Sequence, residues 1–111
     1  MATHYFVVLT RAVPGQEEAF HRWYDEQHLD DCLRLPGVRS ARRFRIDREA
    51  DAPAGTVPFD SLALYEIESD DPAAVVRRIG EIAGSEAMPL SEAFDRSATL
   101  RALAVAAGAR P

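Results

Sequence analysis

Four short stretches of this chain are rich in β-branched and aromatic residues or alternate between apolar and polar positions, as β-strands do. They cover His4–Arg11, Val38–Asp47, Ser61–Glu68 and Leu100–Gly108. The last stretch is also rich in alanine and leucine, which favour helices as well. The pattern predicts four strands.

Two further stretches repeat apolar residues every three or four positions, which is the spacing of one face of an α-helix. The first covers Gln16–Leu35 and ends at a proline and a glycine. The second begins with Asp71 as N-cap and ends at Gly84. Between these elements we expect a loop over Glu49–Pro58 and an irregular turn or short helix over Met88–Ser97.

The resulting element order, βαββαβ, predicts an α+β fold of the ferredoxin-like kind. In that arrangement an antiparallel sheet carries both helices on one face, with the first and third strands in the centre. The chain has 111 residues and no internal linker or repeat, so residues 1–111 are expected to form a single domain.

The two central strands are apolar on both of their faces. Two helices can cover only one face of the sheet, and a free apolar face of this size is unusual on a monomer. We therefore expect a homodimer in which the uncovered faces of two copies pack together. On the first strand we expect Phe6 and Val8 on one face and Tyr5, Val7 and Leu9 on the other. On the third strand we expect Leu62 and Leu64 on one face and Ala63, Tyr65 and Ile67 on the other.

Composition excludes several classes of function. All 13 basic residues are arginine, so Schiff-base and pyridoxal chemistry, which need a lysine amine, are excluded. The net charge of -5 disfavours nucleic acid, and the apolar runs of the chain, such as Phe6–Leu9 and Ala102–Ala107, are too short for a membrane span. The start of the chain lacks the features of a secretory signal, and its single cysteine cannot form an internal disulfide. We expect a cytoplasmic protein.

The stretch "WYDEQHLDDCLRLPGV" (Trp23–Val38) gathers most of the candidate chemistry. His28 lies one helical turn from Tyr24 and from Cys32, and three residues from Asp31. Asp31 could orient the imidazole so that His28 serves as a proton shuttle at a cavity. Alternatively, His28 is a buried structural residue whose nitrogens are satisfied by backbone groups or by Asp31.

Other side chains are candidates for binding a substrate. Trp23 and Tyr24 either line an aromatic ligand site or belong to the core, and Tyr65 and Tyr5 are further candidate contacts. The arginines of the second strand either protect a sheet edge from aggregation or place Arg43 in the cavity, where it would bind a carboxylate or phenolate.

Nucleophilic and metal chemistry find less support. Cys32 beside His28 permits a thiolate–imidazole pair, but no oxyanion hole is evident, and single buried cysteines are usually inert. His21 and His28 lie two helical turns apart, about 10 Å, which is too far for one metal ion. A set of His28, Asp31 and Cys32 would be incomplete, so no metal site is predicted.

Residues 5–46 carry a resemblance to a known family. A strand, a "PG" turn followed by glutamate, a "WYDE.H" helix, and "PGV" leading into an "RRF" strand resemble the EthD-like branch of the dimeric α+β barrel superfamily. In the C-terminal half the element order and "MPLSEAFD" are similar too. One departure is Asp30, where the family pattern has proline. The resemblance implies a dimeric barrel with a cavity between sheet and helices in each subunit.

The same resemblance implies a function. Relatives include small cofactor-independent enzymes that oxygenate, cyclise or decarboxylate aromatic polyketides. The first hypothesis is therefore an enzyme without cofactor, acting on an aromatic or polyketide-like molecule, with His28 moving a proton and Tyr24 or Arg43 stabilising an oxyanion. The alternative is a non-catalytic dimeric protein that binds a hydrophobic metabolite.

Overall fold

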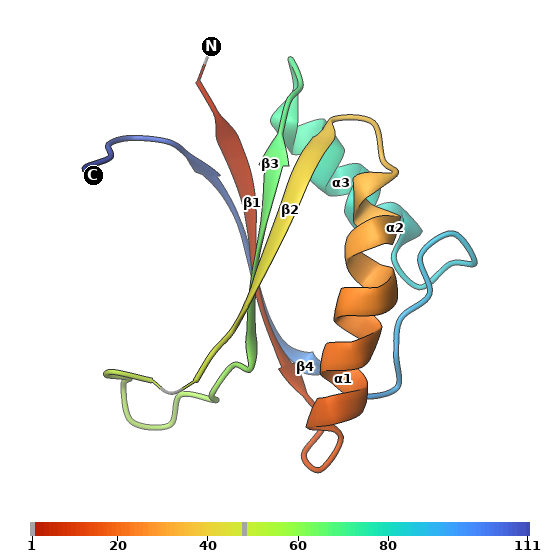
Figure 1. The fold of residues 1–111 in the computed structure, drawn as a ribbon, viewed down its shortest axis with the longest axis vertical. Coiled ribbons are helices and arrows are strands. Elements are labelled where there is room, and N and C mark those ends of the chain that lie inside the picture. Colours follow the sequence, from red (N-terminus) through yellow and green to blue (C-terminus); the bar gives the residue numbers. More distant parts are fainter. Residues whose placement is uncertain (1, 48) are drawn as a thin grey trace.

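Four antiparallel strands form one sheet in the order β2-β3-β1-β4 (Figure 1). The computed structural model describes residues 2–47 and 49–111. The predicted ferredoxin-like α+β fold, with the first and third strands in the centre, is confirmed. The strands are β1 (His4–Ala12), β2 (Val38–Arg45), β3 (Ser61–Ile67) and β4 (Phe94–Val105).

The helical segments lie together on one side of the twisted sheet, and the other side carries no helix among the described residues (Figure 1). They are α1 (Glu17–Trp23), η1 (Tyr24–His28), α2 (Leu29–Leu33) and α3 (Pro72–Ile82). None of the described helices is long and apolar enough to cross a membrane. We call the side that faces the helices the covered face, and the opposite side the open face.

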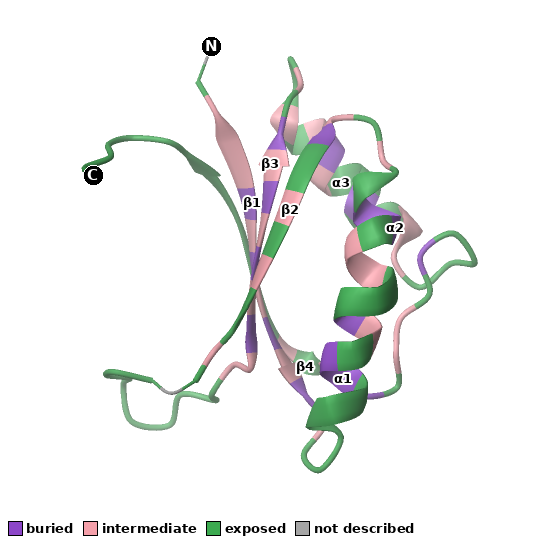
Figure 2. Cartoon of the chain, viewed as in Figure 1, coloured by how far each residue is buried: buried purple, intermediate pink, exposed green. Residues whose placement is uncertain are grey.

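The core lies between the covered face and the helices. Figure 2 shows the buried positions along β1 and β3 alternating with partly exposed ones, as expected for a sheet packed on one face. Strand pairing places Phe6 opposite Tyr65, and both side chains point into the core. The largest fully buried side chains are Tyr24, Tyr65, Phe6, Phe20 and Met88.

A π-helical turn interrupts the first predicted helix. The stretch Gln16–Leu35 was expected to be one α-helix, but η1 separates α1 from α2, and the Leu29 N–H donates to the Tyr24 carbonyl five residues back. The segment contains neither proline nor glycine, so its backbone does not require the interruption. Short π-helical turns occur frequently at functional sites.

An irregularity at the start of β2 changes one predicted face. Val38 pairs with Ile67 but Ser40 pairs with Glu66, so the register shifts between them. Val38 is therefore buried on the covered face, whereas Ser40 and Phe44 lie on the open face. The regular alternation of the strand Val38–Asp47 would put Val38, Ser40 and Phe44 on one face, and a bulge reverses this alternation for Val38.

The last strand begins earlier than its sequence suggests. The structure has β4 at Phe94–Val105, so part of Met88–Ser97, expected to be a turn or short helix, is strand. The register shifts here as well, because Thr99 pairs with Thr10 while Phe94 pairs with Ala12. More residues of β4 than of β1 lie between these two pairs, which is a bulge on β4.

Gly37, which ends the first helical segment, provides a stability prediction. Its φ of +94° favours glycine, and a Cβ there would lie 2.7 Å from Val75 Cγ2. Gly15 has a similar φ of +88°, with nothing within 4 Å of its Cβ position. We expect Gly37→Ala to lower the free energy of unfolding in urea by about 2–4 kcal/mol, and Gly15→Ala by about 1–2 kcal/mol. Equal losses would contradict the steric role of Val75.

Candidate functional site

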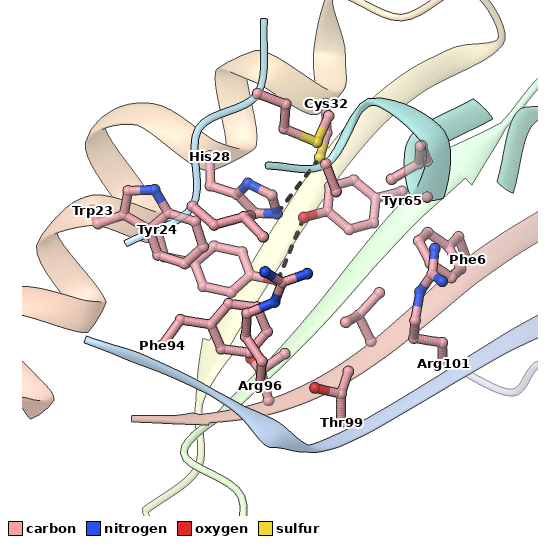
Figure 3. Close-up of a pocket in the computed structure, with 17 residues that line it drawn as sticks. Phe6, Trp23, Tyr24, His28, Cys32, Tyr65, Phe94, Arg96, Thr99 and Arg101 are labelled. Carbon is pink, nitrogen blue, oxygen red and sulfur yellow. Dashed lines mark hydrogen bonds between the residues drawn. The ribbon is translucent and has the colours of Figure 1, made fainter. Parts of the chain in front are cut away.

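A cavity of about 240 Å³ lies between the covered face and the helices (Figure 3). Side chains from β1, β3 and β4 form one wall, and α1, η1, α2, α3 and the segment after α3 form the other. Much of the lining is aromatic or aliphatic, as is usual for small-molecule sites. The aromatic residues are Phe6, Trp23, Tyr24, Tyr65 and Phe94.

His28 lines this cavity from the end of η1. Its ring stacks on Trp23 with centroids 4.6 Å apart and meets Tyr24 edge-on at 5.0 Å. Its Nε2 atom is 3.8 Å from Cys32 Sγ. Burial lowers the pKa of His28 to about 4, so the imidazole is neutral at neutral pH and able to accept a proton.

Asp31 lies near His28 but does not hold it by a hydrogen bond. Its Oδ1 atom accepts a 2.6 Å bond from Arg34 Nη1. Its Oδ2 atom and His28 Nδ1 are buried, and neither has a hydrogen-bond partner among the described residues. The negative charge of Asp31 still raises the pKa of His28 against the larger effect of burial. Asp31 therefore acts on the imidazole electrostatically.

Two buried phenols stand beside the imidazole. The Tyr65 hydroxyl donates to the Tyr24 hydroxyl at 3.5 Å, and each side chain is about 1% exposed. Burial raises the pKa of Tyr24 to about 12 and that of Tyr65 well above its usual value. Both remain protonated at neutral pH, and because Tyr65 already donates its single O–H to Tyr24, the O–H of Tyr24 is the one that can donate to an oxygen in the cavity.

Cys32 contributes a thiol rather than a thiolate. Burial raises the pKa of Cys32 to about 11, so the sulfur is protonated at neutral pH. Among the described residues no group of three histidine, cysteine, aspartate or glutamate side chains is placed to hold a metal ion.

Arg43 points to the covered face but does not line the cavity. Its Nε and Nη2 donate to the two carboxylate oxygens of Asp25 at 2.6 and 2.8 Å. Its Nη1 contacts His21 Nδ1 at 2.9 Å and donates to Ser61 Oγ at 3.2 Å. The guanidinium also lies 5.1 Å from the centre of the Tyr24 ring. Arg43 thus packs on the ring of Tyr24 from outside the cavity. Its guanidinium nitrogens are already bonded to Asp25, His21 and Ser61.

The remaining candidates divide between the two faces. Trp23 lines the cavity, donates from Nε1 to the Pro89 carbonyl at 3.2 Å, and stacks on Phe94 at 5.8 Å. Tyr5 pairs with Glu66 on the open face and is not part of the cavity. The structure therefore brings together His28, Tyr24, Trp23 and Tyr65, with Asp31 just outside.

Strand β4 supplies cavity residues that the sequence pattern did not indicate. Phe94, Arg96, Thr99 and Arg101 all line the cavity. Arg96 and Arg101 are five positions apart, so a regular strand would send them to opposite faces. The bulge of β4 lets both reach the covered face. The aromatic Phe94 was the one sequence signal for an earlier strand start.

Comparison with known proteins supports the fold. No family description matches this chain, and no curated protein matches it in sequence. A protein of Shewanella loihica PV-4, provisionally described as a monooxygenase, has a TM-score of 0.54 at 13% identity, over 100% of this chain and 99% of its own. This likeness shows a shared fold.

Two further solved structures are similar over most of their length. An ethyl tert-butyl ether D (EthD) family protein of Bacillus halodurans C-125 has a TM-score of 0.45 at 17% identity, over 98% of this chain and 100% of its own. A dimeric ferredoxin-like protein of unknown function from Thermobifida fusca YX has a TM-score of 0.47 at 12% identity, over 95% and 92%.

The low pKa of His28 predicts a pH dependence of stability. The pKa of His28 falls from 6.5 to about 4 on folding. Between these two pH values His28 is therefore protonated in the unfolded chain but neutral in the folded one. Stability therefore falls as pH decreases from about 6.5 to about 4, by roughly 3 kcal/mol from this residue. We expect urea unfolding of His28→Gln to depend less on pH than wild type across this range. Parallel curves for the two proteins would contradict the assignment.

Proposed function

We propose that the cavity takes an aromatic or polyketide-like small molecule and that His28 moves a proton to or from it, without a cofactor. The observation that carries this proposal is a neutral imidazole on the wall of a cavity that is otherwise largely aromatic. Proton transfer requires a base in its unprotonated form beside the reacting group, and His28 meets that requirement at neutral pH.

The proposed step removes a proton from an acidic C–H next to a carbonyl group of the substrate. His28 takes the proton, and the electrons of the C–H bond move onto the carbonyl oxygen to form an enolate. In this step the protonated phenol of Tyr24 donates to that oxygen, and Tyr65 supports it by donating to Tyr24. Because burial disfavours imidazolium, the proton stays on His28 only while the enolate is beside it, and it is then returned.

This step is common to several reactions of aromatic polyketides. An enolate carbon can attack a second carbonyl to close a ring or react with oxygen, and a carbanion left by loss of carbon dioxide needs a proton back. Oxygenation and cyclisation can therefore both begin with proton removal by His28, whereas decarboxylation needs a proton donor at the carbanion, and neutral His28 is not one. The proposal is accordingly a class of proton-transfer chemistry, with Trp23 and Phe94 as aromatic walls for the substrate.

A non-catalytic binding protein is the second candidate. One observation favours it: Asp31 is ion-paired with Arg34, and no carboxylate of the described residues accepts a hydrogen bond from His28 that would fix its tautomer and orientation. In this case the cavity holds a hydrophobic metabolite that leaves unchanged, and the imidazole serves only as part of the wall.

We further infer that two copies pack through their open faces. Val7, Leu9, Leu62 and Leu64 alternate with the core residues and are half-buried, with no helix above them. Beside them, Phe44 and Leu100 are 40% and 45% exposed. Such a contiguous apolar surface is typical of an interface. A homodimer would bury it.

The proton-transfer proposal predicts catalysed hydrogen exchange. 2-Tetralone is a bicyclic aromatic ketone with acidic protons beside its carbonyl group. We expect the protein to accelerate its deuterium uptake from D₂O, followed by mass spectrometry. His28→Gln should slow the catalysed exchange by roughly 10²-fold or more. His4→Gln, which removes a histidine from β1 outside the cavity, is the matched control and should keep the wild-type rate.

Binding is followed separately through the single tryptophan, because Trp23 lines the cavity. Its indole N–H gives one NMR signal, which should shift when 2-tetralone binds to wild type or to His28→Gln. If His28→Gln binds the ketone and exchanges it at the wild-type rate, the proton-shuttle role is wrong. If the ketone binds without any catalysed exchange in wild type, the binding alternative is favoured.

The dimer proposal predicts a change of mass on charging the open face. Leu64→Glu places a carboxylate in the middle of that face, so sedimentation should show a monomer where wild type is a dimer. Leu33→Glu makes the same change at an exposed leucine of α2 and should remain dimeric. A wild-type protein that is already monomeric at micromolar concentration would refute the inference.

A further inference from the structure

The cavity carries positive charge that no acid balances. Its lining includes Arg96 and Arg101, while no aspartate or glutamate among the described residues lines it. This contrasts with the chain as a whole, whose net charge is -5. We propose that the cavity binds an aromatic carboxylate of one or two rings, with Arg96 and Arg101 holding the carboxylate group. This inference rests on the proposed function and specifies its substrate class.

The two arginines differ from those that serve the fold. Arg43 is surrounded by Asp25, His21 and Ser61, and Arg34 is paired with Asp31. Neither Arg96 nor Arg101 makes an ion pair or hydrogen bond with any described residue.

The acid next to Arg96 is already engaged elsewhere. Asp95 lies 3.4 Å from Arg11 and accepts hydrogen bonds from Ser97. Asp95 therefore does not neutralise Arg96, and the guanidinium of Arg96 can bind an anion from outside the chain. Both arginines are exposed, which places them at the mouth of the cavity where an anion would enter.

The guanidinium of Arg101 packs between an aromatic ring of the sheet and helix α3. This guanidinium lies 5.0 Å from the centre of the Phe6 ring, and Figure 3 shows the two side chains next to each other. A Cβ at Gly80 of α3 would lie 3.5 Å from both terminal nitrogens of Arg101. At this distance such a Cβ would be in ordinary van der Waals contact with the guanidinium, so Arg101 packs directly against α3 at Gly80.

The interior of the cavity also offers a hydroxyl beside Tyr24. Thr10 is 3% exposed, and its Oγ1 atom makes no hydrogen bond of good geometry with a described residue, although it lies near enough to the Tyr24 hydroxyl to lower the pKa of Tyr24. A buried polar atom of this kind is usually satisfied by water or by a ligand. Thr10 is paired with Thr99 across the strands, and both line the cavity. A polar substituent on the ring of the ligand would find its partner here.

The volume limits the size of the ligand. Pockets for drug-sized molecules usually enclose about 300–1,000 Å³, and this cavity encloses about 240 Å³. One ring or two fused rings suit this space better than a larger ring system. Arginine prefers planar carboxylates because its guanidinium can donate two parallel hydrogen bonds to them. Shape and charge together therefore favour a small aromatic acid.

The test compares 2-naphthoate with its neutral isostere 2-naphthamide by isothermal titration calorimetry. The two molecules share rings and shape and differ in charge. We expect wild type to bind the acid at least tenfold more tightly than the amide. In Arg96→Met with Arg101→Met this preference should fall towards one, whereas Arg78→Met, which removes an exposed arginine of α3 outside the cavity, should retain it. Retained amide binding shows that the double variant is folded.

Different outcomes overturn different claims. Equal affinity for acid and amide in wild type, or an unchanged preference in the double variant, refutes the carboxylate assignment while leaving an aromatic cavity. If neither compound shifts the Trp23 indole signal of wild type, both this assignment and the proposed function fail. A preference that disappears in the double variant, and survives in Arg78→Met, supports the assignment.

Discussion

The ring of Tyr24 joins three parts of the molecule. Phe20 of α1 meets it edge-on at 5.7 Å, the Arg43 guanidinium of β2 lies 5.1 Å from its centre, and His28 approaches at 5.0 Å. Its hydroxyl accepts from Tyr65 of β3. Core, sheet edge and cavity therefore depend on one aromatic side chain, because each element is positioned against it. A change at Tyr24 would disturb the folding of the chain and the shape of the cavity together.

Tyr24 is also the first residue of the π-helical turn. Tyr24 and His28 are the first and last residues of η1, and both line the cavity while their rings remain in contact. Trp23, directly before the turn, stacks on His28 and on Phe94. Three large rings are thus packed against the covered face within a few residues. The turn is the part of the helix where this packing takes place.

Periodicity was sufficient to predict the fold and part of the site. The alternation of apolar residues placed the strands, and the three- and four-residue spacing placed Trp23, Tyr24 and His28 on the inner side of a helix. The same alternation separates Tyr5 from Tyr65, which the structure finds on opposite faces. Irregularities were beyond this reasoning, since a bulge changes which side chains share a face without any fixed residue signature. The reversal at Val38 and the placement of Arg96 with Arg101 both follow from bulges.

The strict alternation of β3 has a consequence for how this protein can change over time. Leu64 and Tyr65 are adjacent in the chain, yet one belongs to the open face and the other to the cavity. Mutations at successive positions of β3 therefore change different parts of the protein, either the open face or the cavity. A lineage can alter the cavity wall at Tyr65 while keeping the apolar open face at Leu62 and Leu64. Sequence drift in the two parts is uncoupled by geometry alone.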